Sequence, residues 1–208
     1  MKILDDLAIC RMRAKLRAEA VLQTGLTQAE AHGKNMWSKL RERFKNLVES
    51  SIRVVGGVVL SSYLEKDVFL TVTSSRETKT WNIIFRGRVD FAAIVNLKDS
   101  IFTMLVEVTE YRDAPVVTKN RLQAYASALY GELGFPVVPV LIILGEHEMI
   151  KDVQVLKKNK ILVPGIELRR IVNRLIRTLT SEEVFKVSSR DLCVSCDPSI
   201  RRLCPYQH

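Results

Sequence analysis

The chain has 208 residues, of which 47% are hydrophobic and 26% are charged, and its formal net charge is +9. This composition is typical of a globular domain with a sizeable core, and it excludes a disordered or fibrous chain. The longest apolar run, FPVVPVLIIL at residues 135–144, contains two prolines and is too short to span a bilayer, and residues 1–10 lack the basic and apolar regions of a signal peptide. We therefore expect a cytoplasmic protein without a membrane segment.

The positive charge lies towards the two ends of the chain. Residues 11–50 contain nine Lys and Arg against four Asp and Glu, and residues 151–208 contain twelve against six. Residues 51–150 contain ten against eleven. Two basic ends around a near-neutral centre form either an ordinary solvated surface or an electrostatic surface for nucleic acid.

The first part of the chain is predicted to be helical. Apolar residues recur at helical spacing over residues 4–22, and Gly25 ends this helix. Thr27 and Glu30 form a capping box for a second helix, which is predicted to run to about Val48.

The middle of the chain changes to strands, which are rich in β-branched and aromatic residues. Four strands, forming a meander, are predicted at residues 51–64, 67–75, 80–96 and 100–111. They are followed by a helix at 116–134 that ends at Gly134, strands at 136–145 and 152–157, and an amphipathic helix at 165–179.

This order of elements predicts an α/β or α+β domain with a central mixed sheet. We divide the chain into an N-terminal helical part at 1–50, a core at 51–165, and a C-terminal helix with a cysteine-rich tail at 166–208. The three parts are expected to form one compact unit, in which the N-terminal helices meet the tail.

The cysteines are unevenly placed. Cys193, Cys196 and Cys204 fall within twelve residues, and the fourth cysteine, Cys10, lies near the other terminus. Disulfides are rare in the cytosol, so the cluster indicates either a metal site or a set of small buried core residues. Zinc and iron–sulfur clusters both accept four cysteines, and the spacing does not separate them.

Two carboxylates interrupt stretches that otherwise read as buried strands. These are Asp90 in FRGRVDFAAIV and Glu107 in FTMLVEVTEY. Burying a carboxylate without a partner is costly, so each acid either faces solvent or shares a divalent cation with the other.

Polar residues of the neighbouring helices extend this set. Lys119 and Gln123 are four residues apart on one helical stripe, and His32 lies near the start of the second helix. With the two acids they suit phosphodiester cleavage, which needs a metal held by carboxylates and a cation for the transition state. The alternatives are a surface lysine and a structural histidine.

Taken together, these residues resemble a known nuclease family. The segments GRVD, VEVTEY and KNRLQAYASAL, together with one N-terminal and three C-terminal cysteines, resemble the PD-(D/E)XK nucleases of the RecB type. Within that group the chain is most similar to the CRISPR-associated exonucleases, the fourth of the Cas proteins. The resemblance covers nearly the whole chain, and the cysteine layout is its most specific part.

The resemblance implies a restriction-endonuclease-like α/β core and an Mn²⁺- or Mg²⁺-dependent exonuclease acting on single-stranded or frayed DNA. It also implies a role in CRISPR adaptation, an antiviral defence, beside the Cas integrase proteins, and it leaves a homo-oligomer open. The catalytic residues it implies are Asp90, Glu107, Lys119, Gln123 and Tyr125. The metal ligands it implies are His32, Asp90, Glu107 and the Val108 carbonyl. The cluster ligands it implies are Cys10, Cys193, Cys196 and Cys204, with [4Fe–4S] favoured over [2Fe–2S].

The chain departs from the family pattern at two points. Thr109 stands where the family has a lysine, and Lys119 is the candidate to replace it. The Gln-x-x-x-Tyr motif is shifted, because Gln123 is followed four residues later by Ser127 and Tyr125 is preceded four residues earlier by Arg121. A DNA-binding assembly subunit that has lost the chemistry, and a zinc-stapled structural protein, therefore stay as alternatives.

Overall fold

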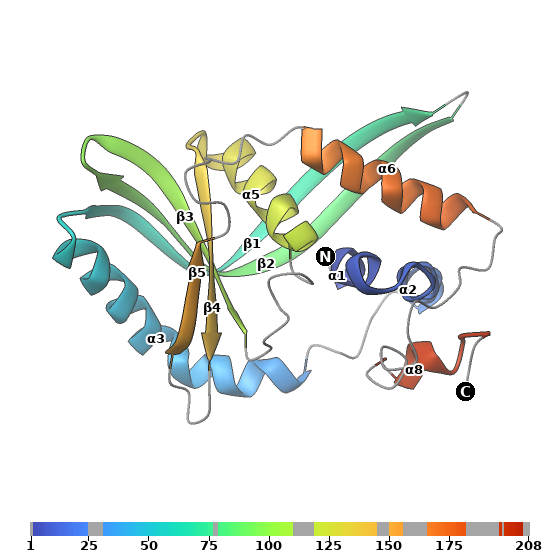
Figure 1. Ribbon diagram of the computed structural model, residues 1–208, viewed down its shortest axis with the longest axis horizontal. Coiled ribbons are helices and arrows are strands. Elements are labelled where there is room, and N and C mark those ends of the chain that lie inside the picture. The colour runs from blue at the N-terminus through green and yellow to red at the C-terminus, as the bar shows by residue number, and fades with distance from the viewer. Residues whose placement is uncertain are drawn as a thin grey trace.

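The computed structural model describes residues 2–24, 31–76, 79–109, 119–144, 150–155, 166–181, 196 and 198–205. The fold is an α/β fold in which helices cover both faces of one sheet (Figure 1). The sheet has five strands in the order β1-β2-β3-β4-β5, and they are β1 (Val58–Arg76), β2 (Lys79–Leu97), β3 (Ser100–Thr109), β4 (Val137–Leu144) and β5 (Ile150–Val155). The predicted mixed central sheet is thus confirmed.

The sheet changes direction at its centre. β1, β2 and β3 are antiparallel neighbours, as expected for a meander. β3 and β4 are parallel, so after β3 the chain must cross back to the end of the sheet at which β3 begins. α5 (Lys119–Leu133) lies in that connection. β5 closes the sheet as an antiparallel edge strand.

The core has a layer on each face of the sheet. On one face, α5 packs Leu122, Tyr125 and Leu129 against strand residues such as Leu105 and Val137. On the other face, α3 (Ala31–Val54) packs its apolar side against β2, β3 and β4, with Phe44 edge-on to Phe91. Successive side chains of β2 point to opposite faces of the sheet, so this strand contributes buried residues to both layers.

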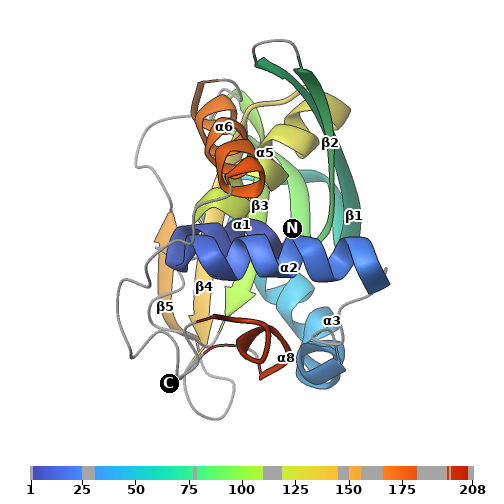
Figure 2. The ribbon, with the colours of Figure 1, turned by 90° about the vertical axis from the view of Figure 1, so that its right-hand side faces the viewer.

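A third apolar cluster lies beside the sheet. It joins α1 (Lys2–Ile9), α2 (Arg11–Thr24), α5 and α6 (Ile166–Thr180) to the outer part of β2. The amphipathic stripe predicted for α6 is buried here, with Val172, Leu175 and Ile176 almost inaccessible to solvent. α6 runs along the ribbon formed by the ends of β1 and β2, and α1 and α2 lie below it (Figure 2).

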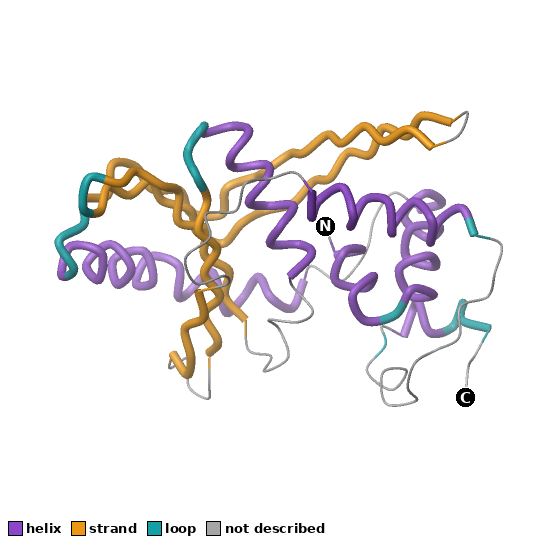
Figure 3. The backbone as a smooth tube through the Cα atoms, turned by 45° about the horizontal axis from the view of Figure 1, so that its top comes forward, coloured by secondary structure: helices purple, strands orange, loops and turns teal. Residues whose placement is uncertain are grey.

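The prediction of four strands in the meander was wrong, because two of them are one strand. The polar residues between the predicted strands resemble a turn, but β1 continues through them, with Glu65 at a φ of +48°. β1 pairs with β2 from Val58 to Arg76, and this long partner keeps the backbone extended where local sequence favours a break. The result is a two-stranded ribbon that projects beyond the other strands (Figure 3).

Two helix boundaries also differ from the predictions. The first predicted helix is divided at Cys10 into α1 and α2. The second continues to Val54, through residues predicted as strand, and ends where Gly56 takes a φ of +79°. The Gly56 N–H donates to the Arg53 carbonyl and the Gly57 N–H to the Ile52 carbonyl, which together form a Schellman motif.

The final helix is α8 (Pro198–Arg201), in the cysteine-rich tail, and it packs against α2. The predicted meeting of the N-terminal helices and the tail is therefore confirmed for the described part of the tail. No helix within the described ranges combines the length and apolar character needed to cross a membrane.

Candidate functional site

Asp90 and Glu107 lie where two neighbouring strands separate. β2 and β3 pair from Leu97 and Ser100 up to Phe91 and Val106, and the next positions along this register are Asp90 and Glu107. β3 continues from there beside β4 alone, with Glu107 opposite Leu141. The two acids thus occupy the fork between β2 and β3, which brings them together as predicted.

The two carboxylates are bound to the backbone of the opposite strand. Asp90 Oδ2 accepts a hydrogen bond of 2.8 Å from the Val108 N–H, in the place of a ladder hydrogen bond. Glu107 Oε1 accepts a longer one of 3.4 Å from the Asp90 N–H. These bonds fix both side chains at the fork, and they bring Val108, also predicted in the site, to the same place.

Burial keeps both acids difficult to ionise. Glu107 is 4% exposed, and burial together with the nearby Asp90 charge raises the pKa of Glu107 to about 8. Burial also raises the pKa of Asp90 to about 6, against the hydrogen bond from Val108 and the charge of Arg121. Two adjacent carboxylates with raised pKa values are a feature of catalytic and metal-binding sites.

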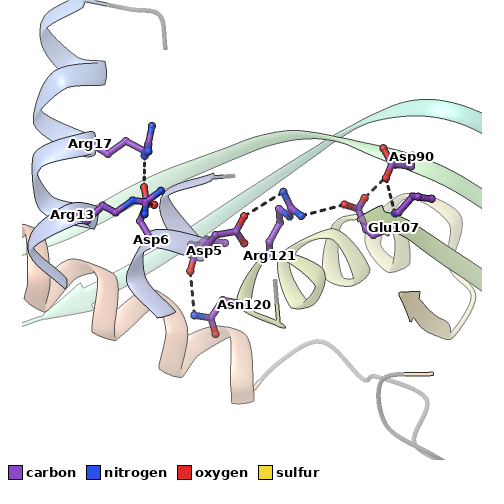
Figure 4. Close-up of polar contacts among 10 residues, drawn as sticks. Asp5, Asp6, Arg13, Arg17, Asp90, Glu107, Asn120 and Arg121 are labelled. Carbon is purple, nitrogen blue, oxygen red and sulfur yellow. Dashed lines mark hydrogen bonds and ion pairs between the residues drawn. The ribbon is translucent and has the colours of Figure 1, made fainter. Parts of the chain in front are cut away.

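Arg121 is the cation that the described structure places at this pair (Figure 4). Its Nη2 lies 3.5 Å from Glu107 Oε2, and its Nη1 lies 3.2 Å from Asp5 Oδ2. The guanidinium therefore links α5 to both the fork and α1. The signal for Arg121 in the sequence is its position four residues before Tyr125.

Tyr125 packs over the strand next to Asp90. A Cβ atom on Gly87 would lie 2.4 Å from Tyr125 Cε1, so the ring requires glycine at this position of β2. The Arg121 guanidinium lies 6.0 Å from the ring centroid, and burial together with the Glu107 charge raises the pKa of the Tyr125 hydroxyl. Arg121 and Tyr125, four residues apart, thus share the side of α5 that faces the fork.

Gln123 lies on another side of α5. Two residues along a helix correspond to a rotation of roughly 200°, so Gln123 is not on the face of Arg121 and Tyr125. It is 7% exposed, and its carbonyl accepts a hydrogen bond of 2.8 Å from Ser127. Of the two registers, the one of Arg121 with Tyr125 places both residues on one face of the helix, and the catalytic role of Gln123 stays a prediction.

Two other predicted residues begin helices. Lys119 is the first residue of α5, and His32 lies in the first turn of α3. Their side chains lie outside the described part of the structure, so both remain predictions.

A third carboxylate near the fork was missed. Glu65 on β1 lies opposite Asp90 in the strand register, forms an ion pair of 3.3 Å with Arg41 of α3, and its charge raises the pKa of Asp90. A positive φ in a residue with a long side chain is uncommon and marks a strained position. The polar residues around it gave no sequence signal beyond that of a turn.

The described cysteines gather around the junction of α1 and α2. Cys10 is the junction residue, and Cys196 and Cys204 flank α8, which packs on α2. Burial raises the pKa of the Cys196 thiol, Arg13 opposes this, and Asp6, Cys10 and Cys204 reinforce it. All three are free thiols of intermediate exposure, so the two ends of the chain do meet here; Cys193 lies outside the described residues.

Across the residues that the structure describes, no group of three or more His, Cys, Asp or Glu side chains has metal-coordinating geometry.

Comparison with known proteins identifies a shared fold. No protein-family model matches the chain, and no curated protein matches it. Among solved structures, the crystal structure of SSO0001 superposes with a TM-score of 0.54 at 17% sequence identity, over 99% of this chain and 85% of the other. At this identity the similarity shows that both chains have the same α/β fold.

Proposed function

We propose that the protein is a metal-dependent exonuclease that cleaves phosphodiester bonds of single-stranded or frayed DNA, with a PD-(D/E)XK type of core. The observation that carries the proposal is the carboxylate pair at the fork of β2 and β3, in which Glu107 is buried and lies beside Arg121. Such a pair has little structural use, because ionising two neighbouring carboxyl groups away from water destabilises the fold.

The donor set at the fork fits a hard divalent cation. Asp90 and Glu107 supply carboxylate oxygens, and Mg²⁺ and Mn²⁺ prefer oxygen ligands. The Val108 N–H points at Asp90, and in an extended strand the carbonyl of the same residue points to the same side, which suits Val108 as a further ligand. His32 is proposed as the fourth. A bound divalent ion would activate water and offset the charge of the phosphate.

Arg121 is the best supported cation for the cleavage step. Thr109 follows Glu107 by two residues and cannot carry a charge, whereas Arg121 already lies against Glu107. A guanidinium stays protonated at all working pH values and presents several N–H donors to a phosphate. Tyr125 shares its helix face and is proposed to orient the substrate. Lys119 remains a second candidate for the same role.

Cys10, Cys196 and Cys204, with Cys193 completing the set, are proposed to bind an iron–sulfur cluster, with [4Fe–4S] favoured. The gathering of three thiols from both ends of the chain supports this, because thiolates are the usual ligands of such clusters. The cluster would hold the cysteine-rich tail to the helices at the N-terminus.

The biological setting follows the same resemblance. We propose a role in CRISPR adaptation, in which the protein trims prespacer DNA beside the Cas integrase proteins in the cytoplasm. The excess of Lys and Arg at both ends of the chain supports binding to the DNA backbone without sequence preference.

A second function is an assembly subunit that binds DNA and has lost the chemistry. The observation that favours it is Thr109 at the position of the family lysine. The two functions differ in one outcome, because only the nuclease consumes DNA.

The test is the degradation of end-labelled single-stranded DNA with Mn²⁺ by the full chain purified without oxygen. Wild type is compared with Glu107→Ala, Arg121→Ala and Lys119→Ala, and with Glu132→Ala as a control at an exposed ion pair with Lys66. We expect Glu107→Ala to lose nearly all activity, Arg121→Ala to lose about a hundredfold, and the control to match wild type. Loss in Lys119→Ala without loss in Arg121→Ala assigns the cation to Lys119, and an inactive wild type favours the assembly subunit.

A further inference from the structure

A line of charged contacts runs from the carboxylate pair to the helix at the start of the chain (Figure 4). Glu107 contacts Arg121 of α5, and Arg121 contacts Asp5 of α1. Asp5 is one residue before Asp6, which forms an ion pair with Arg13 at 2.6 Å and another with Arg17. The carboxylate pair and the start of α2 are therefore connected through two adjacent aspartates.

Asp5 is buried although it carries a charge. It is 9% exposed, and the desolvation cost of burying a carboxylate to this extent must be offset by a charged or hydrogen-bonding partner. One partner of Asp5 is the Arg121 Nη1 at 3.2 Å, and the Nη2 of the same guanidinium is directed at Glu107. A planar guanidinium held at one side has little freedom at the other.

The helix that carries Asp5 is fixed at both ends. Leu4 and Leu7 are 0% and 1% exposed in the cluster with α6, and the Leu4 carbonyl accepts a hydrogen bond of 3.3 Å from Asn120. At the other end, the Cys10 N–H donates to the Asp6 carbonyl and the Cys10 carbonyl accepts from Ala14. α1 is therefore a rigid support for Asp5 relative to α5.

We propose that Asp5 is a positioning residue that holds Arg121 against Glu107, so that α1 forms part of the catalytic structure. Asp5 acts on the carboxylate pair through Arg121. The expected effect of Asp5 on kcat rests on the proposed nuclease function. The expected effect on folding stability rests on the Asp5–Arg121 ion pair alone.

The test uses the full chain, purified without oxygen, and the variants Asp5→Asn, Asp5→Glu, Arg121→Gln and the double variant Asp5→Asn with Arg121→Gln. The matched control is the exposed pair Asp67–Arg88 at 2.8 Å, changed to Asp67→Asn, Arg88→Gln and both. Activity on end-labelled single-stranded DNA with Mn²⁺ is resolved into kcat and KM, and urea unfolding midpoints are measured without divalent ions.

We expect Asp5→Asn to lower kcat at least tenfold with KM within twofold of wild type, and Asp5→Glu to recover most of the loss. In the Arg121→Gln background, Asp5→Asn should change kcat less than threefold, because no guanidinium is left to position. The midpoint of the double variant should fall by less than the sum of the two single shifts, whereas the control pair should show additive shifts.

Two results overturn the assignment. One is a kcat for Asp5→Asn equal to that of wild type, and the other is additive midpoint shifts for Asp5 and Arg121. An inactive wild type overturns the proposed nuclease function instead, and the midpoints then decide whether Asp5 and Arg121 are coupled.

Discussion

Glu107 makes folding stability depend on pH in the absence of a divalent ion. Its pKa rises from 4.5 to about 8 in the folded protein, so the folded state holds a proton that the unfolded state releases near pH 4.5. Stability from this proton is fully present below pH 4.5 and is lost as the pH rises through about 8. At 1.36 kcal/mol per pH unit, the loss between pH 6 and pH 8.5 is about 2–3 kcal/mol.

Asp90 adds little to this loss. Its pKa of about 6 means that the carboxyl group is already half ionised at pH 6, so less than about 1 kcal/mol remains to be lost above that pH. The two acids together thus predict that the free energy of unfolding is about 3 kcal/mol lower at pH 8.5. With a urea dependence of roughly 2 kcal/mol per molar, the midpoint falls by more than 1 M.

The assay is urea unfolding of the full chain at pH 6 and pH 8.5 with EDTA, for wild type, Glu107→Gln and the exposed control Glu132→Gln. Glutamine has nearly the same shape and no charge, so Glu107→Gln should lose most of the pH dependence and be more stable than wild type at pH 8.5. Mn²⁺ should restore wild type at pH 8.5, because it binds the folded state alone. A Glu107→Gln variant with the wild-type pH dependence would refute the view that burial of this carboxylate sets it.

Three further changes test the packing and the thiols. Gly87→Ala places a Cβ against the Tyr125 ring and should destabilise the fold by about 1–3 kcal/mol in urea unfolding. Gly131→Ala should instead stabilise it by about 0.5–1 kcal/mol, because no described atom beyond its chain neighbours and the nearby backbone of α5 lies within 4 Å of its Cβ position. Equal effects of the two changes would contradict the close approach of Tyr125 to Gly87. Asp6→Asn removes the carboxylate that pairs with the buried Arg17 and should cost about 3–5 kcal/mol of folding free energy by the same measurement. A loss no larger than that of the exposed Asp67→Asn would contradict the view that this ion pair stabilises the fold. Cys204→Ser should lower the iron content and visible absorbance of protein purified without oxygen, and a colourless wild type that contains zinc would contradict the iron–sulfur proposal.

The sequence was sufficient where local pattern and chemistry agree. The alternating and helical periods predicted most helices and strands, and acids inside apolar strands predicted the pairing of Asp90 with Glu107. The single strand β1 was missed because its extended backbone through Glu65 depends on pairing with β2, which no local pattern reports. The end of α3 was missed because Ile52 and Val54 favour strands, whereas the Gly56–Gly57 motif and packing on the sheet decide for helix.

The polar partners of the carboxylate pair were harder to predict than the pair itself. Arg121 reaches Glu107 because α5 packs against β3, and Asp5 reaches Arg121 because α1 packs against α5. Both contacts join residues that are distant in sequence, so spacing alone cannot reveal them. Gln123 was chosen for its residue type, but helical rotation directs it elsewhere.

The meeting of Cys10 with Cys196 and Cys204 also has a consequence for biosynthesis. Cys10 cannot meet Cys196 or Cys204 until the ribosome has made the residues between them. All five strands lie in that interval, so they are synthesised before α1 and α2 can contact the tail. Arg13 and Arg17 are synthesised soon after Asp6 and can pair with it on the nascent chain, whereas Arg121, a partner of Asp5, is synthesised more than a hundred residues later. A chain released early therefore keeps its central acids but lacks the contacts that join its two ends.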